Sequence, residues 1–125
     1  MEQKEITVSI LFDTLFDMES AISKENKLTT LVNVFTVEPA RQQELVDLLI
    51  EATEKVMRHM PGFISANIHK SLDGEKVVNY AQWESVEAFQ AMLQNEDAKP
   101  HMTQAARIAI SFEPRLYTVS HVDHK

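Results

Sequence analysis

Residues 61–83 have the sequence PGFISANIHKSLDGEKVVNYAQW, and this stretch decides the fold. Pro61-Gly62 stops a preceding helix and turns the chain. The runs Phe63–Lys70 and Lys76–Trp83 are both typical of strands. Asp73-Gly74, which lies between them, is a dipeptide that favours a tight hairpin turn. The stretch therefore predicts two antiparallel strands joined by a hairpin.

A strand and a helix are predicted immediately before this hairpin. Thr30 to Val37 is rich in Val, Thr and Phe, which favour a strand. Glu38-Pro39 then opens a helix, because proline fits the first helical turn, where its missing N–H costs nothing. Over residues 40–60 the apolar residues recur at helical spacing on one face, namely Leu45, Leu48, Leu49, Ala52, Val56 and Met60.

A second helical region and a last strand follow the hairpin. Ser85 is a candidate N-cap for a helix whose apolar side carries Val86, Phe89, Met92 and Leu93. A break at residues 95–100 leads to a shorter helical stretch with Met102, Ala105, Ala106 and Ile108. Glu113-Pro114 precedes a predicted strand from Arg115 to Val122.

The predicted element order is strand, helix, strand, strand, helix, strand. This order is that of an α+β, ferredoxin-like (βαββαβ) domain, an antiparallel sheet with both helices on one face. We assign residues 28–125 to this domain and residues 1–27 to an N-terminal extension that ends in the polar run Ser23–Lys27. Within the extension, residues 13–24 can form an acidic amphipathic helix.

Both faces of the predicted sheet carry large apolar groups. In the first strand Leu31, Asn33 and Phe35 alternate with Val32, Val34 and Thr36, and two helices can cover only one face. We expect a second subunit to cover the other face, which predicts a homodimer that closes a dimeric α/β barrel. The alternative is that residues 1–27 cover this face instead.

Composition and charge exclude several classes of protein. The chain has 125 residues and a net charge of −7, so binding to nucleic acid or to an anionic membrane surface is not expected. It has no cysteine, which excludes disulfides and thiolate sites, and its two glycines are too few for a dinucleotide-binding loop. The N-terminus lacks the features of a signal peptide, and we expect a cytoplasmic protein.

Two asparagines and the single tryptophan are the main candidates for a functional site. Asn33 and Asn79 lie in the middle of predicted strands, where asparagine is disfavoured and costly to bury. Trp83 follows Asn79 by four residues and shares its face, so its indole can lean back over a common cavity. Facing the helices, these groups would be polar anchors in an apolar pocket. Alternatively, the amides bond to turns or to each other and Trp83 belongs to the core.

The histidines do not form a metal-binding pattern. His69, His101, His121 and His124 show neither HxH nor HExxH spacing, so we expect no metal site. His101 follows Pro100 at the start of the last helical stretch, where a helix N-terminus favours the neutral imidazole. It can act as a base or orient a substrate, or it can be a half-buried capping residue.

The sequence resembles the antibiotic biosynthesis monooxygenases, also called the ABM domain family. The resemblance covers residues 30–122 and rests on LVNVFTV, MPGFISANIHKS, VVNYAQWESVEAF and KPHM. Well-studied members are dimeric, cofactor-free oxygenases that convert an anthrone-like polyketide to a quinone with O₂. The resemblance therefore implies a small aromatic substrate, O₂ as co-substrate, and neither cofactor nor metal.

The same resemblance implies roles for individual residues. Asn33, Asn79 and Trp83 match family residues that line the pocket and are implicated in catalysis, and we add His101 as the group that takes or returns a proton. Phe35, Phe89 and Met92 are expected to contact the substrate. Phe89 stands where some members carry a tyrosine, so a phenol has no role here.

Two other functions remain open at this stage. A quinone-binding protein of the same superfamily would use the same pocket without turnover. The haem-degrading monooxygenases share the first-strand asparagine and use a histidine near the position of His101, but they also use a tryptophan where this chain has Met92.

Overall fold

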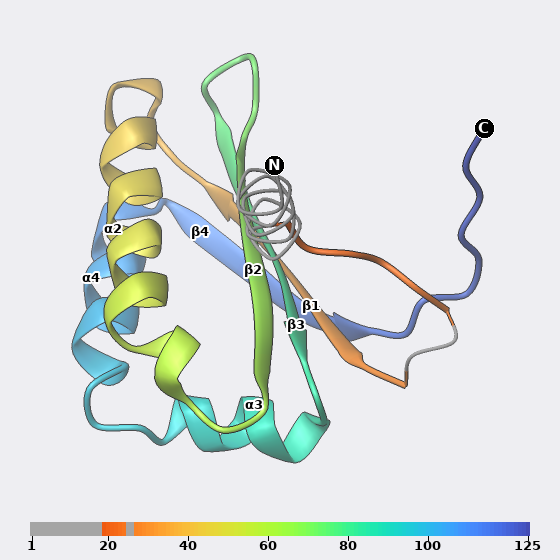
Figure 1. Ribbon diagram of the computed structural model, residues 1–125. Coiled ribbons are helices and arrows are strands. Elements are labelled where there is room, and N and C mark those ends of the chain that lie inside the picture. The colour runs from red at the N-terminus through yellow and green to blue at the C-terminus, as the bar shows by residue number, and fades with distance from the viewer. Residues whose placement is uncertain (1–18, 25–26) are drawn as a thin grey trace, which may run out of the picture.

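The structure, a computed structural model, describes residues 19–24 and 27–125. Its centre is a four-stranded antiparallel sheet with the strand order β2-β3-β1-β4 (Figure 1). The two central strands, β3 and β1, come from sequence segments that are separated by a helix and a hairpin, as the predicted topology requires. The strands are β1 (Thr29–Thr36), β2 (Phe63–Lys70), β3 (Lys76–Trp83) and β4 (Ser111–Tyr117).

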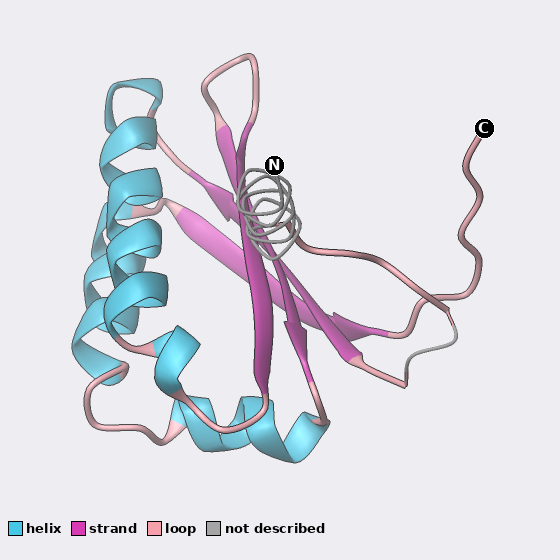
Figure 2. Cartoon of the chain, in the orientation of Figure 1, coloured by secondary structure: helices cyan, strands magenta, loops and turns pink. Residues whose placement is uncertain are grey.

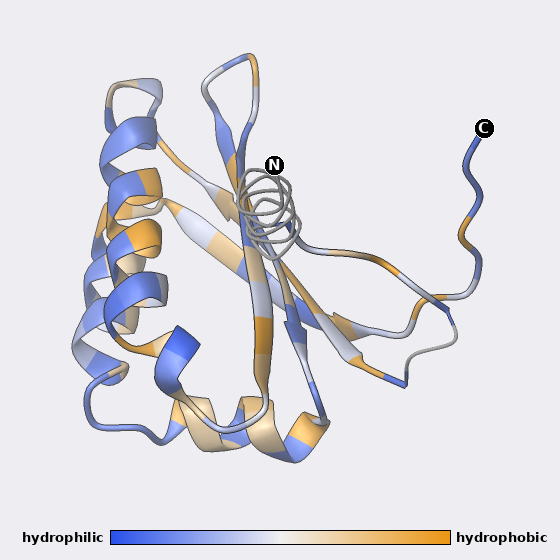
Figure 3. Cartoon of the chain, viewed as in Figure 1, coloured by the Kyte–Doolittle hydropathy of each residue, from blue (hydrophilic) through white to orange (hydrophobic). Residues whose placement is uncertain are grey.

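The helices all lie on one side of this sheet (Figure 2). This two-layer arrangement confirms the predicted α+β, ferredoxin-like fold. Figure 3 shows that the apolar residues of α2 gather on the side of the helix that faces the sheet. The helical elements are η1 (Pro39–Arg41), α2 (Gln42–Lys55), η2 (Met57–His59), α3 (Val86–Leu93) and α4 (Lys99–Ile108).

The helix predicted over residues 40–60 is not continuous. A 3-10 turn precedes α2, and the chain leaves the α conformation at Val56, whose φ and ψ are −124° and −64°. Val56 and Met60 therefore pack on a different part of the core from the one that Leu45 and Leu48 contact. The apolar spacing alone did not reveal this break, because Val56 and Met60, which flank η2, still pack against the core.

The last strand also differs from the prediction. It spans Ser111–Tyr117 instead of Arg115–Val122, and Pro114 lies inside it, paired with Asn33 of β1. Proline cannot donate a backbone hydrogen bond, which restricts it to particular places in a sheet. It is tolerated here because β4 is an edge strand, bonded only to β1.

The core consists of two neighbouring clusters between the helices and the sheet. One is built around Leu45, Val77 and Phe35, and the other around Leu31, Trp83 and Met92. Ser85 begins α3 as predicted, since its Oγ accepts a hydrogen bond from the backbone N–H of Ala88 at 3.1 Å.

Residues 19–24 cross the sheet face that lies opposite the helices. Ser20 Oγ donates to Asn67 Oδ1 at 2.6 Å, and the Ala21 carbonyl accepts a hydrogen bond from Gln82 Nε2 at 2.8 Å. Gln82 is only 2% exposed, and Ser65 Oγ donates to its Oε1. Part of the extension thus covers part of the second face.

These residues are not helical, so the helix predicted over residues 13–24 is wrong for residues 19–24. The remainder of that prediction, residues 13–18, lies outside the described residues. Within residues 19–24 and 27–125, no helix has the length and apolar character needed to cross a membrane.

Candidate active site

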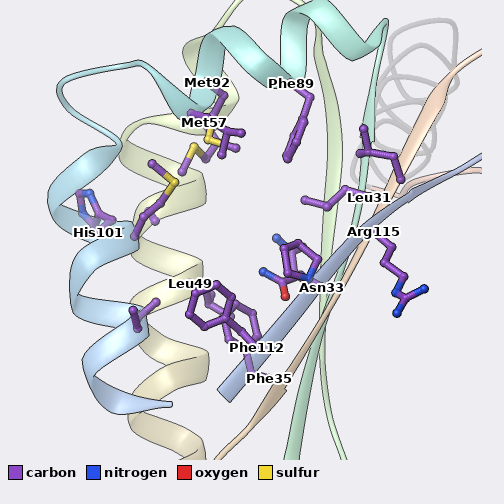
Figure 4. Close-up of a pocket in the computed structure, with 18 residues that line it drawn as sticks. Leu31, Asn33, Phe35, Leu49, Met57, Phe89, Met92, His101, Phe112 and Arg115 are labelled. Atoms are coloured by element: carbon purple, nitrogen blue, oxygen red, sulfur yellow. The ribbon is translucent and has the colours of Figure 1, made fainter. Parts of the chain in front are cut away.

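A cavity of about 330 Å³ lies between the helix layer and the sheet (Figure 4). Its volume is in the range of sites for small organic ligands, roughly 300–1,000 Å³. Most of its lining is apolar, and it draws on β1, β3 and β4 from the sheet and on every helical element except η1. The lining residues are Leu31, Asn33, Phe35, Leu49, Ala52, Met57, Asn79, Phe89, Met92, Leu93, His101, Met102, Ala105, Ala106, Phe112, Pro114, Arg115 and Leu116.

The sheet side of the cavity carries two amides side by side. Asn33 and Asn79 are direct cross-strand partners in the antiparallel pair of β1 and β3. The Asn33 side chain points from β1 into the space between the sheet and the helices (Figure 4). Strand alternation produces this placement, because the neighbours of Asn33 on the same face, Leu31 and Phe35, are buried core residues at 5% exposure each.

Neither amide is satisfied by the protein. The Oδ1 atoms of Asn33 and Asn79 are buried and have no hydrogen-bond partner. Each such atom costs about 1–3 kcal/mol of folding free energy. The two Nδ2 atoms are not among the buried side-chain atoms that lack a partner, and an amide nitrogen is a hydrogen-bond donor. The pair therefore presents N–H donors to whatever polar atom a ligand carries.

Trp83 lies apart from this cavity. It is 2% exposed, and its indole is wedged between Phe63, with ring centroids 5.5 Å apart, and Phe89, at 6.4 Å. Its Nε1 is buried without a hydrogen-bond partner. Trp83 is not among the residues that line the cavity. Its surroundings are those of the alternative stated above, a core residue, since it belongs to the buried cluster that also contains Leu31 and Met92.

His101 lines the cavity from the first turn of α4. Its Nδ1 is 3.2 Å from the Asp97 carbonyl oxygen, so a protonated Nδ1 donates there and leaves Nε2 as an acceptor. The ring lies beside α4, across the cavity from Asn33 (Figure 4). Thus His101 belongs to the cavity, but its imidazole does not contact the amide pair.

His101 also affects the pKa of Glu51, an exposed residue of α2. Lys55 Nζ lies 2.9 Å from Glu51, and this hydrogen bond is the main reason that the pKa of Glu51 lies below its usual value. The charge of His101 lowers the same pKa by a smaller effect. The polar surroundings of His101 are therefore at the surface and not among the amides.

The predicted substrate contacts Phe35, Phe89 and Met92 all line the cavity. Met57 and Met102 line it too, and they were missed as site residues because apolar residues at helical spacing look like core. Phe112 of β4 was missed because the last strand was expected to begin at Arg115. Leu116 lay within the predicted strand but was not assigned to the site. In the structure the two residues pair with Phe35 and Leu31 of β1.

Metal binding has no support within the described residues. Residues 19–24 and 27–125 contain no group of three His, Cys, Asp or Glu side chains that can hold an ion. Acid–base chemistry by carboxylates is also absent from the lining. Chemically, the site can hold a flat apolar molecule and stabilise negative charge on one of its oxygens through the two amides.

Comparison with known proteins agrees with this geometry. The antibiotic biosynthesis monooxygenase family matches residues 29–107. Tetracenomycin-F1 monooxygenase of Streptomyces glaucescens is 54% identical over 82 residues, which are 66% of this chain and 73% of that protein.

Among solved structures, the chain is similar to two oxygenases. SnoaB, a cofactor-independent oxygenase from Streptomyces nogalater, has a TM-score of 0.61 and 26% identity, with 76% of this chain and 95% of that chain covered. A monooxygenase from the gene ActVA-Orf6 of Streptomyces coelicolor, in complex with the ligand Nanaomycin D, has a TM-score of 0.69 and 29% identity, with 78% and 91% covered.

Proposed function

Because the chain belongs to the antibiotic biosynthesis monooxygenase family and is a monooxygenase, we propose that it oxidises an anthrone-like aromatic ketone to a quinone with O₂ and no cofactor. The observation that carries this proposal is the amide pair, Asn33 and Asn79, whose oxygens are buried and unpartnered at the floor of an apolar cavity.

The chemistry needs little more than this cavity. An anthrone carries an acidic methylene, and the enolate formed on its deprotonation is electron-rich enough to reduce O₂ by one electron. The radical pair then combines to a peroxide at the former methylene carbon. Loss of water gives the new carbonyl, so that CH₂ and O₂ become C=O and H₂O with no electron left over.

The residues of the cavity have distinct roles in this scheme. Asn33 and Asn79 donate through Nδ2 to the enolate oxygen, and the apolar walls exclude water, which strengthens those hydrogen bonds. His101 takes the methylene proton on Nε2 and returns it to the peroxide, after its ring turns toward the substrate. Trp83 acts behind Phe89, and its unpartnered N–H meets the peroxide only when the Phe89 ring moves aside.

Oxygen uptake by the metal-free protein with a simple anthrone tests the proposal, with quinone absorbance as a second signal. We expect quinone formation well above the spontaneous rate without added flavin or nicotinamide. The double variant Asn79→Ala/Trp83→Phe should fall to the rate in buffer. Wild-type turnover that matches the buffer rate would remove the support for anthrone oxidation.

Quinone binding without turnover is the second candidate. It is favoured by one observation, that Trp83 is not among the residues that line the cavity. Trp83→Phe distinguishes the two functions. An oxygenase should lose turnover and keep its affinity for the quinone product, whereas a binding protein should show a shifted affinity and no turnover in either form.

The assembly that we propose is a homodimer. The sheet face away from the helices carries Val32, Val34, Val78 and Tyr80, and residues 19–24 form hydrogen bonds in its β2–β3 part, at Asn67 and Gln82. We expect light scattering to give twice the chain mass of 14.3 kDa. A monomer mass would favour the alternative, in which the extension alone covers this face.

A further inference from the structure

The cavity is open on one side, where its rim carries apolar residues and one charged residue, Arg115. Its deep lining, such as Leu31 and Ala105, is 5% exposed, whereas Phe112 is 51% and Leu116 39% exposed. Ala106 of α4 is an exposed lining residue as well. The mouth therefore lies between α4 and β4.

The sheet order explains this opening. The strand order puts β4 at the edge. In the described chain the helices pack on β2 and β3 and on one another, and none packs extensively on β4. The cavity-facing side chains of β4 are thus not covered by a helix, and they extend from the amides toward the mouth of the cavity.

Phe112 has the position and shape of a shelf for an aromatic ring. It is the cross-strand partner of Phe35, and the two ring centroids are 6.2 Å apart with an angle of 41° between the planes. Phe35 is buried and fixes one side of the Phe112 ring, while half of that ring remains exposed at the mouth. A flat aromatic ligand that is bound in the cavity and extends through its mouth would cover the exposed part of Phe112.

The register places this shelf at a defined distance from the amides. Pro114 pairs with Asn33, and Phe112 lies two residues from Pro114 on the same face of β4. Two residues of strand span about 7 Å. One or two fused rings bonded at the amides therefore end short of Phe112, whereas three fused rings reach it.

We propose that Phe112 determines specificity by contacting the outermost ring of a fused-ring substrate, so that the enzyme selects for the length of the ring system. The proposal rests on the proposed function, because it takes the amide pair as the point where the substrate oxygen binds. It assigns to the edge strand a selective role that the amides, which contact one oxygen only, cannot have.

Binding of two quinones to the full chain tests the shelf. The probes are naphthoquinone, with two fused rings, and anthraquinone, with three. The emission of Trp83, the single tryptophan, reports binding because its indole contacts Phe89 of the lining. We expect Phe112→Ala to raise the Kd of anthraquinone about tenfold, as for the loss of an aromatic contact, and that of naphthoquinone less than twofold.

Ile110→Ala is the matched control, since Ile110 is a 60% exposed apolar residue beside β4 that does not line the cavity. It should change neither Kd. With an anthrone as substrate, Phe112→Ala should raise KM and leave kcat unchanged.

Two outcomes would overturn the shelf while the proposed function stands. One is an equal change for both quinones, or none. The other is a change in the oligomeric mass of Phe112→Ala by light scattering, which would make Phe112 an interface residue. If wild-type protein binds neither quinone, the proposed function fails and the shelf fails with it.

Discussion

Replacing Asn79 by leucine should lower kcat about 100- to 1,000-fold and at the same time raise the stability of the fold. The loss of rate is that of one preorganised donor to a developing oxyanion. The gain in stability, about 1–3 kcal/mol, follows because the variant removes a buried Oδ1 atom that has no partner in the protein. Steady-state kinetics and denaturant unfolding of the same preparation measure both.

Asn67→Leu is the matched control. Asn67 is also a strand asparagine, but it lies on the opposite face of the sheet, and its amide is bonded to Ser20, Ser65 and the Tyr80 carbonyl. This variant should keep its kcat and lose stability. If Asn79→Leu were destabilised and fully active, the amide pair would be a structural element, and the proposed site would be wrong.

Gly62→Ala should lower the free energy of unfolding by about 2–5 kcal/mol, which is the sum of the costs of backbone strain and of overpacking. Gly62 has a φ of +84°, and a Cβ there would come within 2.5 Å of the Ala88 Cβ. Its carbonyl accepts a hydrogen bond from Glu84 N–H, so this glycine joins the start of β2 to the entry of α3. Denaturant unfolding measures the change.

Gly74→Ala separates the two causes. Gly74 has the same φ of +84°, but its nearest neighbour, the Pro39 Cβ, would be 3.3 Å away. We expect this variant to lose only the strain contribution, about 1–3 kcal/mol. Equal losses at the two glycines would show that the contact of Gly62 with Ala88 contributes nothing.

The sequence predicted the strands and helices well where a local pattern was decisive. Alternation put Asn33 and Asn79 on one face, the Asp73-Gly74 hairpin formed with Gly74 at positive φ, and Ser85 caps α3. The prediction was wrong where tertiary structure allows what a local rule disfavours. The sequence analysis put Pro114 before the last strand, although an edge strand can contain it.

The candidate site was predicted in part. The amide pair, Phe35, Phe89, Met92 and His101 all line the cavity. Trp83 does not, because strand spacing fixes the face of a side chain but not the direction in which a large ring turns once Phe63 and Phe89 pack against it. The methionines of η2 and α4 were not recognisable, since core and cavity residues share one apolar pattern.

The sequence by itself determined the order of strands and helices and placed two asparagines in the middle of strands that are otherwise apolar, because these follow from periods of two and of 3.6 residues along the chain. Only the tertiary structure decided where space remains between the layers and which side of it is open. That depends on how side chains from distant segments fill the interior. Here the uncovered edge strand β4 leaves Phe112 at the mouth and Trp83 behind Phe89.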